Sequence, residues 1–286
     1  MFSLKVENTR GGIFELTNDE KNFQVTNIEG LTPPKATINT SNFANGDGSD
    51  FNSSKIPNRE IVITVYINGD VQTNRLTLYK YFRSKNWCKI YYKDDQRDVY
   101  IEGYVQTMEA PIFTQKQVAQ ISILCPDPYF KDVETIVQSI SKALKKFTFP
   151  FSININEPIP FSEFELEKVT NVINESESET GFISNVSFMG KVDKLEIRNV
   201  DTGENFIIDY NFIANDKLVI NCNRGSKSAI LTRDATEYNL IPYVRSGSIF
   251  FQLGVGDNNF SFLADEGVSD MSVDIQFYYY KVYLGV

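Results

Sequence analysis

The sequence predicts a mainly β protein that folds as two domains. The 286 residues include 22 Phe and 15 Tyr against four Met and one Trp, and most apolar residues recur at every second position, the period of a strand. The chain is long enough for two ordinary cores. Charge also changes along it: residues 1–132 hold 15 basic and 16 acidic side chains, and residues 133–286 hold 13 and 21. We therefore predict an N-terminal domain at 1–130, a connector at 131–150 and a C-terminal domain at 151–286.

Alternating segments in the first domain predict a β-sandwich-like or bent sheet with one short helix. FSLKVEN and GGIFELT predict a hairpin around Gly11 and Gly12, and NFQVTNIEG predicts a third strand that ends at Gly30. In REIVITVYIN, apolar residues occupy both faces, so both faces are expected to be at least partly covered. WCKIYY, DVYIEGYVQ and QVAQISILC predict three more strands.

A long polar stretch, FANGDGSDFNSSKIPN, occupies residues 43–58. A segment of this length without structure of its own is unusual inside a compact domain, and it predicts an arm or flap that a partner orders. Part of it resembles a calcium loop. That interpretation fails because the sixth position from Asn45 is Asp50, where glycine is needed, and the twelfth is Ile56 in place of glutamate.

A basic segment follows at residues 75–97, with seven Lys or Arg against two Asp and six interleaved aromatic residues. This pattern suits stacking on single-stranded nucleic acid. The alternative is a short helix with Leu76, Tyr79 and Phe82 or Arg83 inward, followed by a strand, with the basic residues in solvent. The net charge of −9 argues against general nucleic-acid binding.

The segment CPDPYF closes the first half. Its two prolines cannot continue a ladder or a helix, so the strand is predicted to end at Cys125. A cysteine before proline can also be a thiolate ligand, for instance to haem iron. Cys88, Cys125 and Cys222 lie far apart and are odd in number, which predicts buried reduced thiols and no disulfide framework.

The chain contains no histidine. This excludes Ser-His-Asp and Cys-His catalysis, histidine-ligated zinc and imidazole acid–base chemistry. Three carboxylates, Glu163, Glu165 and Glu167, would project from one face of a strand about 7 Å apart. They suit an acid–base pair or part of a calcium site, but the favoured interpretation is an ordinary strand with one face in water. We predict no enzymatic activity, cofactor or metal.

Residues 131–146 change period, with apolar residues at helical spacing, and predict a connector that is helical or irregular. Short strands follow at FELEKV, GFISNVSFMG, KLEIRNVDTGENFIIDY, KLVINCNRGSKSAIL, SIFFQL, NNFSFLA and SVDIQFYYYKVYL. Hairpin turns are predicted at residues 201–203, 223–226 and 256–258. Many short strands with such turns predict a β-sandwich.

The first twenty residues lack the apolar core of a signal peptide, and no uncharged apolar run reaches membrane-spanning length. We expect a soluble chain, made in the cytoplasm, without a membrane partner.

The order of these segments resembles the distal tail proteins of long-tailed bacteriophages, which form the hub of the tail tip or baseplate. In the first half the resemblance rests on the opening strands through IEGL, PKATINT, NREIVITVYI, LTLYKYF and QVAQISILCPDPYF. In the second half GFISNVSFMG, LEIRNVDTGENFII, DKLVINCNRGSKSAIL and FFQLGVGDNNFSF are similar to the family's galectin-like domain. Nearly the whole chain matches in order.

This resemblance implies a structural virion protein, assembled in the bacterial host cytoplasm and located at the tail tip. Its first domain would close into a hexameric ring that joins the tail tube protein to the tail-associated hub or lysin protein. Receptor-binding proteins dock on the outer domains of some relatives, and DNA would pass through the lumen only as cargo. The candidate intersubunit arm contains Phe43, Phe51 and Ile56.

The galectin-like resemblance leaves a second function open, a carbohydrate-binding module of an adhesion protein. Galectin sugar sites use a histidine, asparagine and arginine cluster and a tryptophan that stacks on the sugar. This chain has no histidine, and its single tryptophan, Trp87, lies in the other domain. A tyrosine among Tyr278, Tyr279 and Tyr280 is the candidate replacement.

Overall fold

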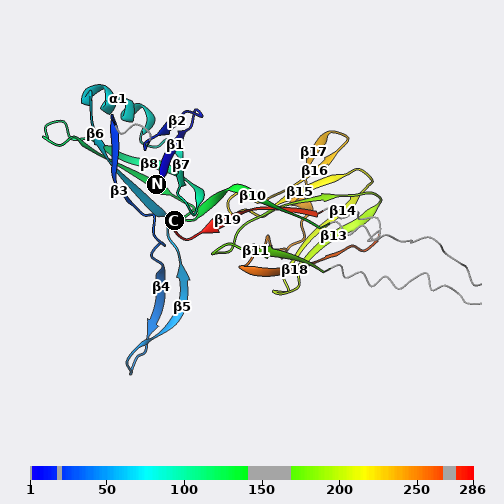
Figure 1. Ribbon diagram of the computed structural model, residues 1–286. Helices are drawn as coiled ribbons and strands as arrows, with labels where there is room; N and C mark the ends of the chain where they lie inside the picture. The colour runs from blue at the N-terminus through cyan, green and yellow to red at the C-terminus, as the bar shows by residue number, and fades with distance from the viewer. Residues whose placement is uncertain (1, 18–20, 141–168, 267–274) are drawn as a thin grey trace, which may run out of the picture. The chain divides into compact units, whose positions relative to one another are not determined.

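The computed structural model describes residues 2–17, 21–140, 169–266 and 275–286 (Figure 1). The chain divides into two compact units: unit 1 contains Met1–Glu134 and Val282–Val286, and unit 2 contains Thr135–Lys281. Both units are built from antiparallel strands, so the predicted mainly β, two-domain fold is confirmed. The last five residues belong to unit 1, although the predicted second domain included them.

Unit 1 is one continuous series of antiparallel neighbours in the order β2-β1-β7-β8-β9-β6-β3. All seven strands were predicted. Their bounds are β1 Ser3–Asn8, β2 Ile13–Glu15, β3 Phe23–Glu29, β6 Arg59–Ile67, β7 Trp87–Lys93, β8 Asp98–Glu109 and β9 Val118–Cys125.

Strand β8 bends this series into a sandwich-like shape. Its first part pairs with β7 and its last part with β9, and the register shifts between Val105 and Thr107. Gly103 lies just before the shift, where a Cβ atom would come within 2.8 Å of Cys125 Sγ and the Leu124 carbonyl oxygen. Only glycine allows the two backbones to approach this closely at the bend.

Strand β6 lies at the centre of the unit 1 core. Ile61, Ile63 and Val65 are fully buried, and the intervening side chains are half-buried. Both faces of β6 are therefore covered, as the apolar pattern of its sequence predicted.

Helix α1 (Val71–Tyr81) covers one end of this core. Asp70 caps it by accepting hydrogen bonds from the Thr73 backbone amide (3.3 Å) and hydroxyl (2.7 Å). Leu78 and Phe82 are buried, whereas Leu76 is 57 % and Tyr79 is 37 % exposed. The predicted inward positions of Leu76 and Tyr79 are wrong. The helix has apolar residues on two stripes, and tertiary contacts with the core select the stripe of Leu78 and Phe82.

The connector is the largest error in the predicted secondary structure. Strand β9 ends at Cys125, as the prolines predicted, but residues 130–140 form strand β10 (Phe130–Ile140) instead of a helix. Lys131 pairs with Tyr100, and the Gln138 side chain bonds both backbone groups of Ile173. These non-local hydrogen bonds override the helical spacing. Residues 141–150 lie outside the described residues.

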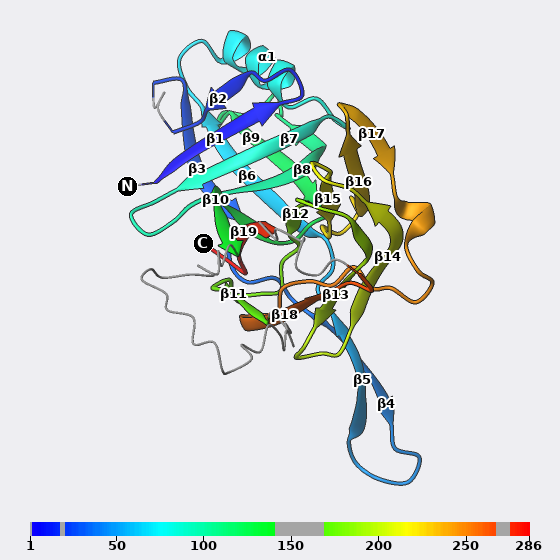
Figure 2. The same cartoon turned by 90° about the vertical axis from the view of Figure 1, so that its right-hand side faces the viewer.

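Residues 37–55, part of which was expected to lack structure of its own, form a hairpin of β4 (Thr37–Asn42) and β5 (Ser49–Lys55). Figures 1 and 2 show this hairpin extending away from the other strands of unit 1. We call it the arm.

Unit 2 is a β-sandwich with sheet orders β11-β18-β13-β14 and β17-β16-β15-β12-β19. Its core contains a connected cluster of ring contacts in which Phe182 and Phe260 contact each other and both contact Phe251 and Phe277. The strands are β11 Thr170–Asn174, β12 Ile183–Ser187, β13 Val192–Asn199, β14 Asn205–Phe212, β15 Lys217–Asn221, β16 Ser228–Arg233, β17 Thr236–Asn239, β18 Gly256–Leu263 and β19 Ile275–Tyr283, with a 3-10 turn η1 at Ile241–Tyr243.

Most of the predicted strands and turns of unit 2 are present. The turns at 201–203 and 223–226 join β13 to β14 and β15 to β16, with Gly203 and Gly225 at positive φ. Two predictions are wrong: SIFFQL contains only an isolated bridge at Leu253, and residues 256–258 begin β18. The structure adds β11 and β17, which were not predicted, and residues 164–168 of the predicted strand FELEKV lie outside the described residues.

Candidate interaction surfaces

The arm is a hairpin with two chemically different faces. Its cross-strand register places Ile38 and Phe51 on the same face, at 56 % and 65 % exposure. On the other face Asn39 donates to Ser53 (2.9 Å) and Asn52 donates to Ser41 (2.6 Å). Every residue of both strands is exposed. The arm therefore presents an apolar face that no described part of the chain covers.

The three predicted arm residues are distributed along this hairpin. Phe51 lies on the apolar face, and Phe43, 48 % exposed, opens the turn, where its ring lies beside Gly48. Ile56 follows β5 and is only partly exposed. Phe43 and Phe51 are thus accessible from solvent, and Ile56 lies at the base of the arm. Sequence reasoning missed Ile38, which alternation along β4 would have placed opposite the Asn39 face.

A second exposed surface lies at the other end of the β6–β9 ladder. It consists of the exposed residues Leu76, Tyr79 and Lys80 of α1, of Arg83 just after the helix, and of the β8–β9 loop at 110–117. The hydrogen bond from the Ile67 amide to the Gln117 carbonyl places this loop at the end of β6 from which the chain enters α1. In that loop Ile112 is 56 % and Phe113 is 100 % exposed. We call this surface the helix pole. The sequence singled out its basic residues but not the loop.

Lys89, Lys93 and Arg97 of the basic segment 75–97 are engaged within unit 1. Lys89 lies 3.6 Å from the centre of the Tyr100 ring, Lys93 pairs with Asp98 (2.5 Å), and Arg97 donates to the Gly285 carbonyl. Tyr81 stacks on Phe14. Few of its aromatic rings therefore remain available to stack on bases.

Arg59 anchors the end of the chain to unit 1. The residue is 3 % exposed, and its guanidinium donates to the carbonyls of Gly30 (2.7 Å), Thr32 (3.3 Å) and Leu284 (2.5 Å). It also lies 4.7 Å from the centre of the Phe130 ring. Burial lowers the pKa of Arg59. The sequence carried no signal for this contact, because its partners are backbone atoms distant in the chain.

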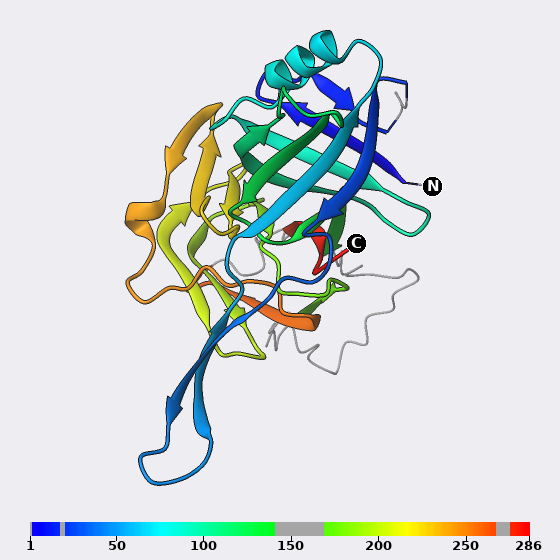
Figure 3. The same cartoon turned by 90° about the vertical axis from the view of Figure 1, so that its left-hand side faces the viewer.

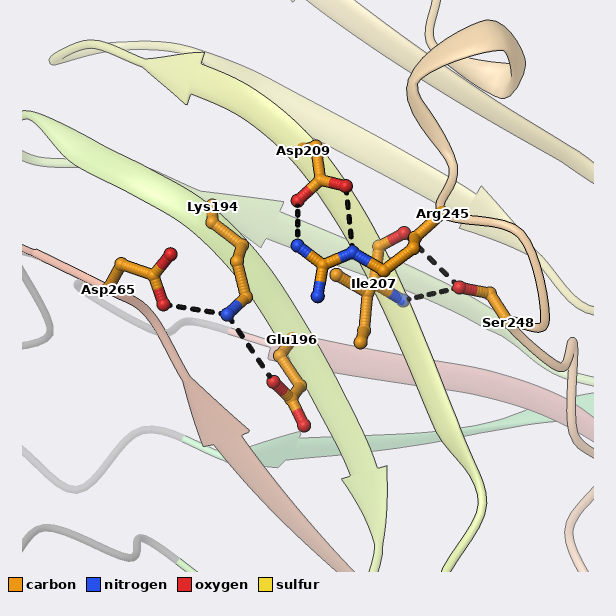
Figure 4. A network of polar contacts seen from close by, with 7 residues as sticks. All are labelled: Lys194, Glu196, Ile207, Asp209, Arg245, Ser248 and Asp265. Carbon is orange, nitrogen blue, oxygen red and sulfur yellow. Dashed lines mark hydrogen bonds and ion pairs between the residues drawn. The ribbon is translucent and has the colours of Figure 1, made fainter.

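A charged network lies on unit 2 beside β13 and β14 (Figure 4). Lys194 contacts Asp265 (2.6 Å) and Glu196 (3.8 Å), and Arg245 binds Asp209 through two hydrogen bonds. The hydrogen bonds from Arg245 are the main cause of the lowered pKa of Asp209. The network joins the loops that hold Arg245 and Asp265 to the two strands. Its charges are paired with one another, which indicates a structural role.

Unit 2 also has an open surface cleft of about 470 Å³. Its lining includes Phe250 and the carboxylates of Glu179, Asp201, Glu204 and Asp257. All four carboxylates already accept hydrogen bonds. Arg224 donates to Glu179, Asn259 to Asp201, Asn171 to Asp257, and the Thr202 hydroxyl to Glu204 (3.1 Å). The cleft thus offers mostly engaged polar groups.

The remaining sequence candidates give no site within the described residues. Tyr279 is 2 % exposed and donates to the Ile173 carbonyl (2.5 Å), so it cannot stack on a sugar; Tyr280 is 37 % exposed and Tyr278 is half-buried. Glu163, Glu165 and Glu167 lie outside the described residues. Among the residues with described positions, no group of three Cys, Asp or Glu side chains could hold a metal ion.

All three cysteines are free and buried, as predicted. Burial raises the pKa of Cys88, Cys125 and Cys222 to about 12, so the thiols stay protonated at neutral pH. A neutral thiol does not support the thiolate-ligand interpretation of Cys125. In the part of the chain that the structure describes, no helix has the length and apolar character needed to cross a membrane.

Similarity to solved structures extends over both units. The structure of the Dit protein of phage SPP1 matches with a TM-score of 0.69, 13 % identity and 99 % coverage of each chain. A chain of the phage P2 baseplate in its activated conformation with Ca matches with a TM-score of 0.53, 11 % identity and 98 % coverage of both. In the Sr form the TM-score is 0.55, with 11 % identity and 98 % and 97 % coverage. At these identities the matches show the shared fold.

Two family models match the sequence itself. The phage tail protein RIFT-related domain matches residues 15–125, and the C-terminal domain of the siphovirus-type tail component, the Dit type, matches residues 175–280. No curated protein matches. The two family domains lie one in each unit and together span most of the chain in the order expected from its sequence segments. The chain therefore belongs to the distal tail proteins of siphophages, structural proteins of the virion tail.

Proposed function

We propose that this chain closes into a hexameric ring at the tip of the phage tail, through unit 1. The ring joins the tail tube protein to the tail-associated hub or lysin protein, and unit 2 offers a surface on which receptor-binding proteins dock. DNA passes through the lumen as cargo, and assembly takes place in the host cytoplasm. The observation that carries this proposal is the exposed apolar face of the arm.

An isolated two-stranded hairpin is at best marginally stable in water. The arm adds two large apolar side chains, Ile38 and Phe51, that are more than half exposed on one face. Covering such a face against another chain removes apolar area from water and orders the hairpin. A ring subunit needs an element that reaches its neighbour, and a hairpin with strands about 20 Å long has that reach.

The relatives support the same assignment. The SPP1 Dit protein is described as a paradigm of the hub adsorption apparatus in phages that infect Gram-positive bacteria, and the p2 chains come from a baseplate. The family membership of this chain makes a tail-tip position the natural one. A ring built from identical subunits presents identical edges in rotation and turns the end of a tube into a docking platform.

The test combines location with assembly. Antibody labelling of virions is expected to mark the tail tip, and light scattering of the purified protein is expected to give a hexamer of the 32.6 kDa chain. The double substitution Phe43→Ala and Phe51→Ala is expected to lower the mass, whereas Met189→Ala, at a residue 73 % exposed on unit 2, is not. Virions whose tips lack the protein would overturn the proposal, and an unchanged mass in the double variant would exclude the arm as the contact.

A further inference from the structure

We propose that the helix pole of unit 1 is the acceptor for the arm of a second copy. This rests on the ring proposed above and names the surface that each arm contacts. The apolar face of the arm would pack on Leu76, Tyr79 and Phe113, and its acidic turn would lie against the basic residues of the pole.

The two surfaces lie at opposite ends of one ladder. Residues 56–58 connect the arm to Arg59 at the start of β6, and the β8–β9 loop leads to Val118 at the start of β9. Arg59 pairs with Cys125, and Tyr66 pairs with Val118, so the arm and the loop lie at different ends of the pair. Figure 3 shows α1 and the arm at opposite ends of unit 1. The nine residues of β6 separate them by about 30 Å.

Their charges are complementary. The arm, residues 37–55, contains Asp47 and Asp50 near its turn and one basic residue, Lys55, at its base. Residues 71–84 and 110–117 contain no acidic residue but four basic ones: Arg75, Lys80, Arg83 and Lys116. This positive pole is unusual in a chain with a net charge of −9. Opposite patches of this kind select the partner and its orientation.

The apolar side chains of the pole are exposed although their backbone is well held. In the β8–β9 loop, Gln117 donates to the Thr114 carbonyl (2.5 Å), and the Thr114 hydroxyl donates to the Lys116 carbonyl (2.8 Å). The loop end is fixed to β6 by the hydrogen bond from the Ile67 amide to the Gln117 carbonyl (2.8 Å). The fully exposed Phe113 therefore sits on a braced loop, which lowers the entropy lost when a partner covers it.

A contact between two different surfaces of identical chains is heterologous. Such contacts propagate from copy to copy and close into a ring when the rotation between neighbours permits. Surfaces at opposite ends of unit 1 allow each copy to donate its arm at one end of this unit and to accept an arm at the other. A two-fold dimer would need the same patch on both copies.

Site-directed cross-linking of the full chain tests the contact. One preparation carries Asp50→Cys on the arm and the other Lys80→Cys on α1, and both positions are exposed. The native cysteines are buried, so each chain has one reactive thiol and a short bismaleimide can only join two chains. The control pairs Asp50→Cys with Gln96→Cys, an exposed position in the β7–β8 turn. Docking raises the local thiol concentration, so we expect about tenfold more covalent dimer from the arm–pole mixture than from the control.

Charge exchange provides a second measurement that does not depend on the cross-linker. Asp47→Lys with Asp50→Lys, or Lys80→Glu with Arg83→Glu, should each lower the mass of the assembly in light scattering. The chain with all four substitutions restores opposite charges across the contact and should assemble again. Equal cross-linking in both mixtures, or a four-fold variant no better than the two double variants, would overturn the inference. A hexamer without the arm–pole cross-link would reject the acceptor and leave the ring intact, whereas absence from the tail tip would reject the proposed function by itself.

Discussion

Replacing Arg59 by methionine should destabilise unit 1 while leaving unit 2 unchanged. Methionine fills much of the space of the arginine stem but donates no hydrogen bond. The carbonyl oxygens of Gly30, Thr32 and Leu284 would each lose a charged donor, and the Phe130 ring would lose its cation. The backbone around Gly30 cannot shift easily to compensate, because it lies tightly against the Glu60 carbonyl.

The expected loss follows from these contacts. Each hydrogen bond from a charged donor contributes about 1.5–3 kcal/mol, and the cation–π contact about 1 kcal/mol. Burying the guanidinium costs desolvation free energy, and methionine avoids this cost, which offsets part of the lost stability. We expect a net loss of about 3 kcal/mol, which corresponds to a decrease of about 10 °C in the melting temperature for a unit of this size.

The single tryptophan makes the measurement specific. Trp87 lies in β7 of unit 1 and unit 2 contains none, so tryptophan fluorescence during urea unfolding reports on unit 1 alone. The matched control is Arg224→Met in unit 2, whose arginine side chain is 60 % exposed in an ion pair with Glu179. It should lose no more than about 1 kcal/mol.

Protease sensitivity of the last five residues gives a second readout. Arg59 holds the Leu284 carbonyl, so Arg59→Met should release the C-terminal segment to carboxypeptidase earlier than Arg224→Met does. The tryptophan signal gives the free energy of unfolding of unit 1. If that free energy in Arg59→Met stayed within about 1 kcal/mol of wild type, the anchoring role would be refuted.

Three further outcomes are expected. Phe260→Ala, which empties a fully buried position in the unit 2 aromatic core, should reduce the stability of unit 2 by about 3–5 kcal/mol in near-ultraviolet circular dichroism; a loss below about 1 kcal/mol would contradict tight packing there. Burial and the hydrogen bond to Glu7 raise the pKa of Tyr91 to about 12. The protonated Tyr91 phenol therefore stabilises the fold fully below the ordinary pKa of tyrosine, and this stabilisation is lost as pH rises through about 12. An ultraviolet titration in which every tyrosine ionises near pH 10 would exclude the raised pKa of Tyr91. The three cysteines, whose pKa burial raises to about 12, should not react with a thiol reagent at pH 8 until guanidinium unfolds the chain, and rapid native labelling would show that a thiol is accessible.

The local sequence pattern predicted correctly those elements whose tertiary surroundings favour the same structure. The alternation of REIVITVYIN became β6 because both faces meet other elements, and the prolines after Cys125 ended β9 because they carry no amide hydrogen. The prediction for residues 130–140 was wrong because their tertiary contacts oppose the local pattern. Their helical spacing is a local feature, whereas the pairing with β8 and the contacts of Gln138 with Ile173 join residues distant in the sequence. These distant contacts stabilise a strand.

The candidate surfaces divide in the same way. Phe43 and Phe51 could be selected from sequence because large apolar residues stood out in a polar stretch. Phe113 could not be selected, because the sequence around it does not indicate that the loop leaves its side chain fully exposed. The inward stripe of α1 was also undecidable, because Leu76 and Tyr79 are as apolar as the residues that are buried.

The sequence by itself determined the β architecture, the two-part organisation, the buried reduced thiols and the exclusion of histidine chemistry, because these depend on composition and on the two-residue period of a strand. Only the tertiary structure decided that the polar stretch is an amphipathic hairpin, that Arg59 holds the end of the chain, and that the arm and helix pole lie at opposite ends of one ladder. Each of these depends on register between distant segments, and register is set by the packing of the whole unit.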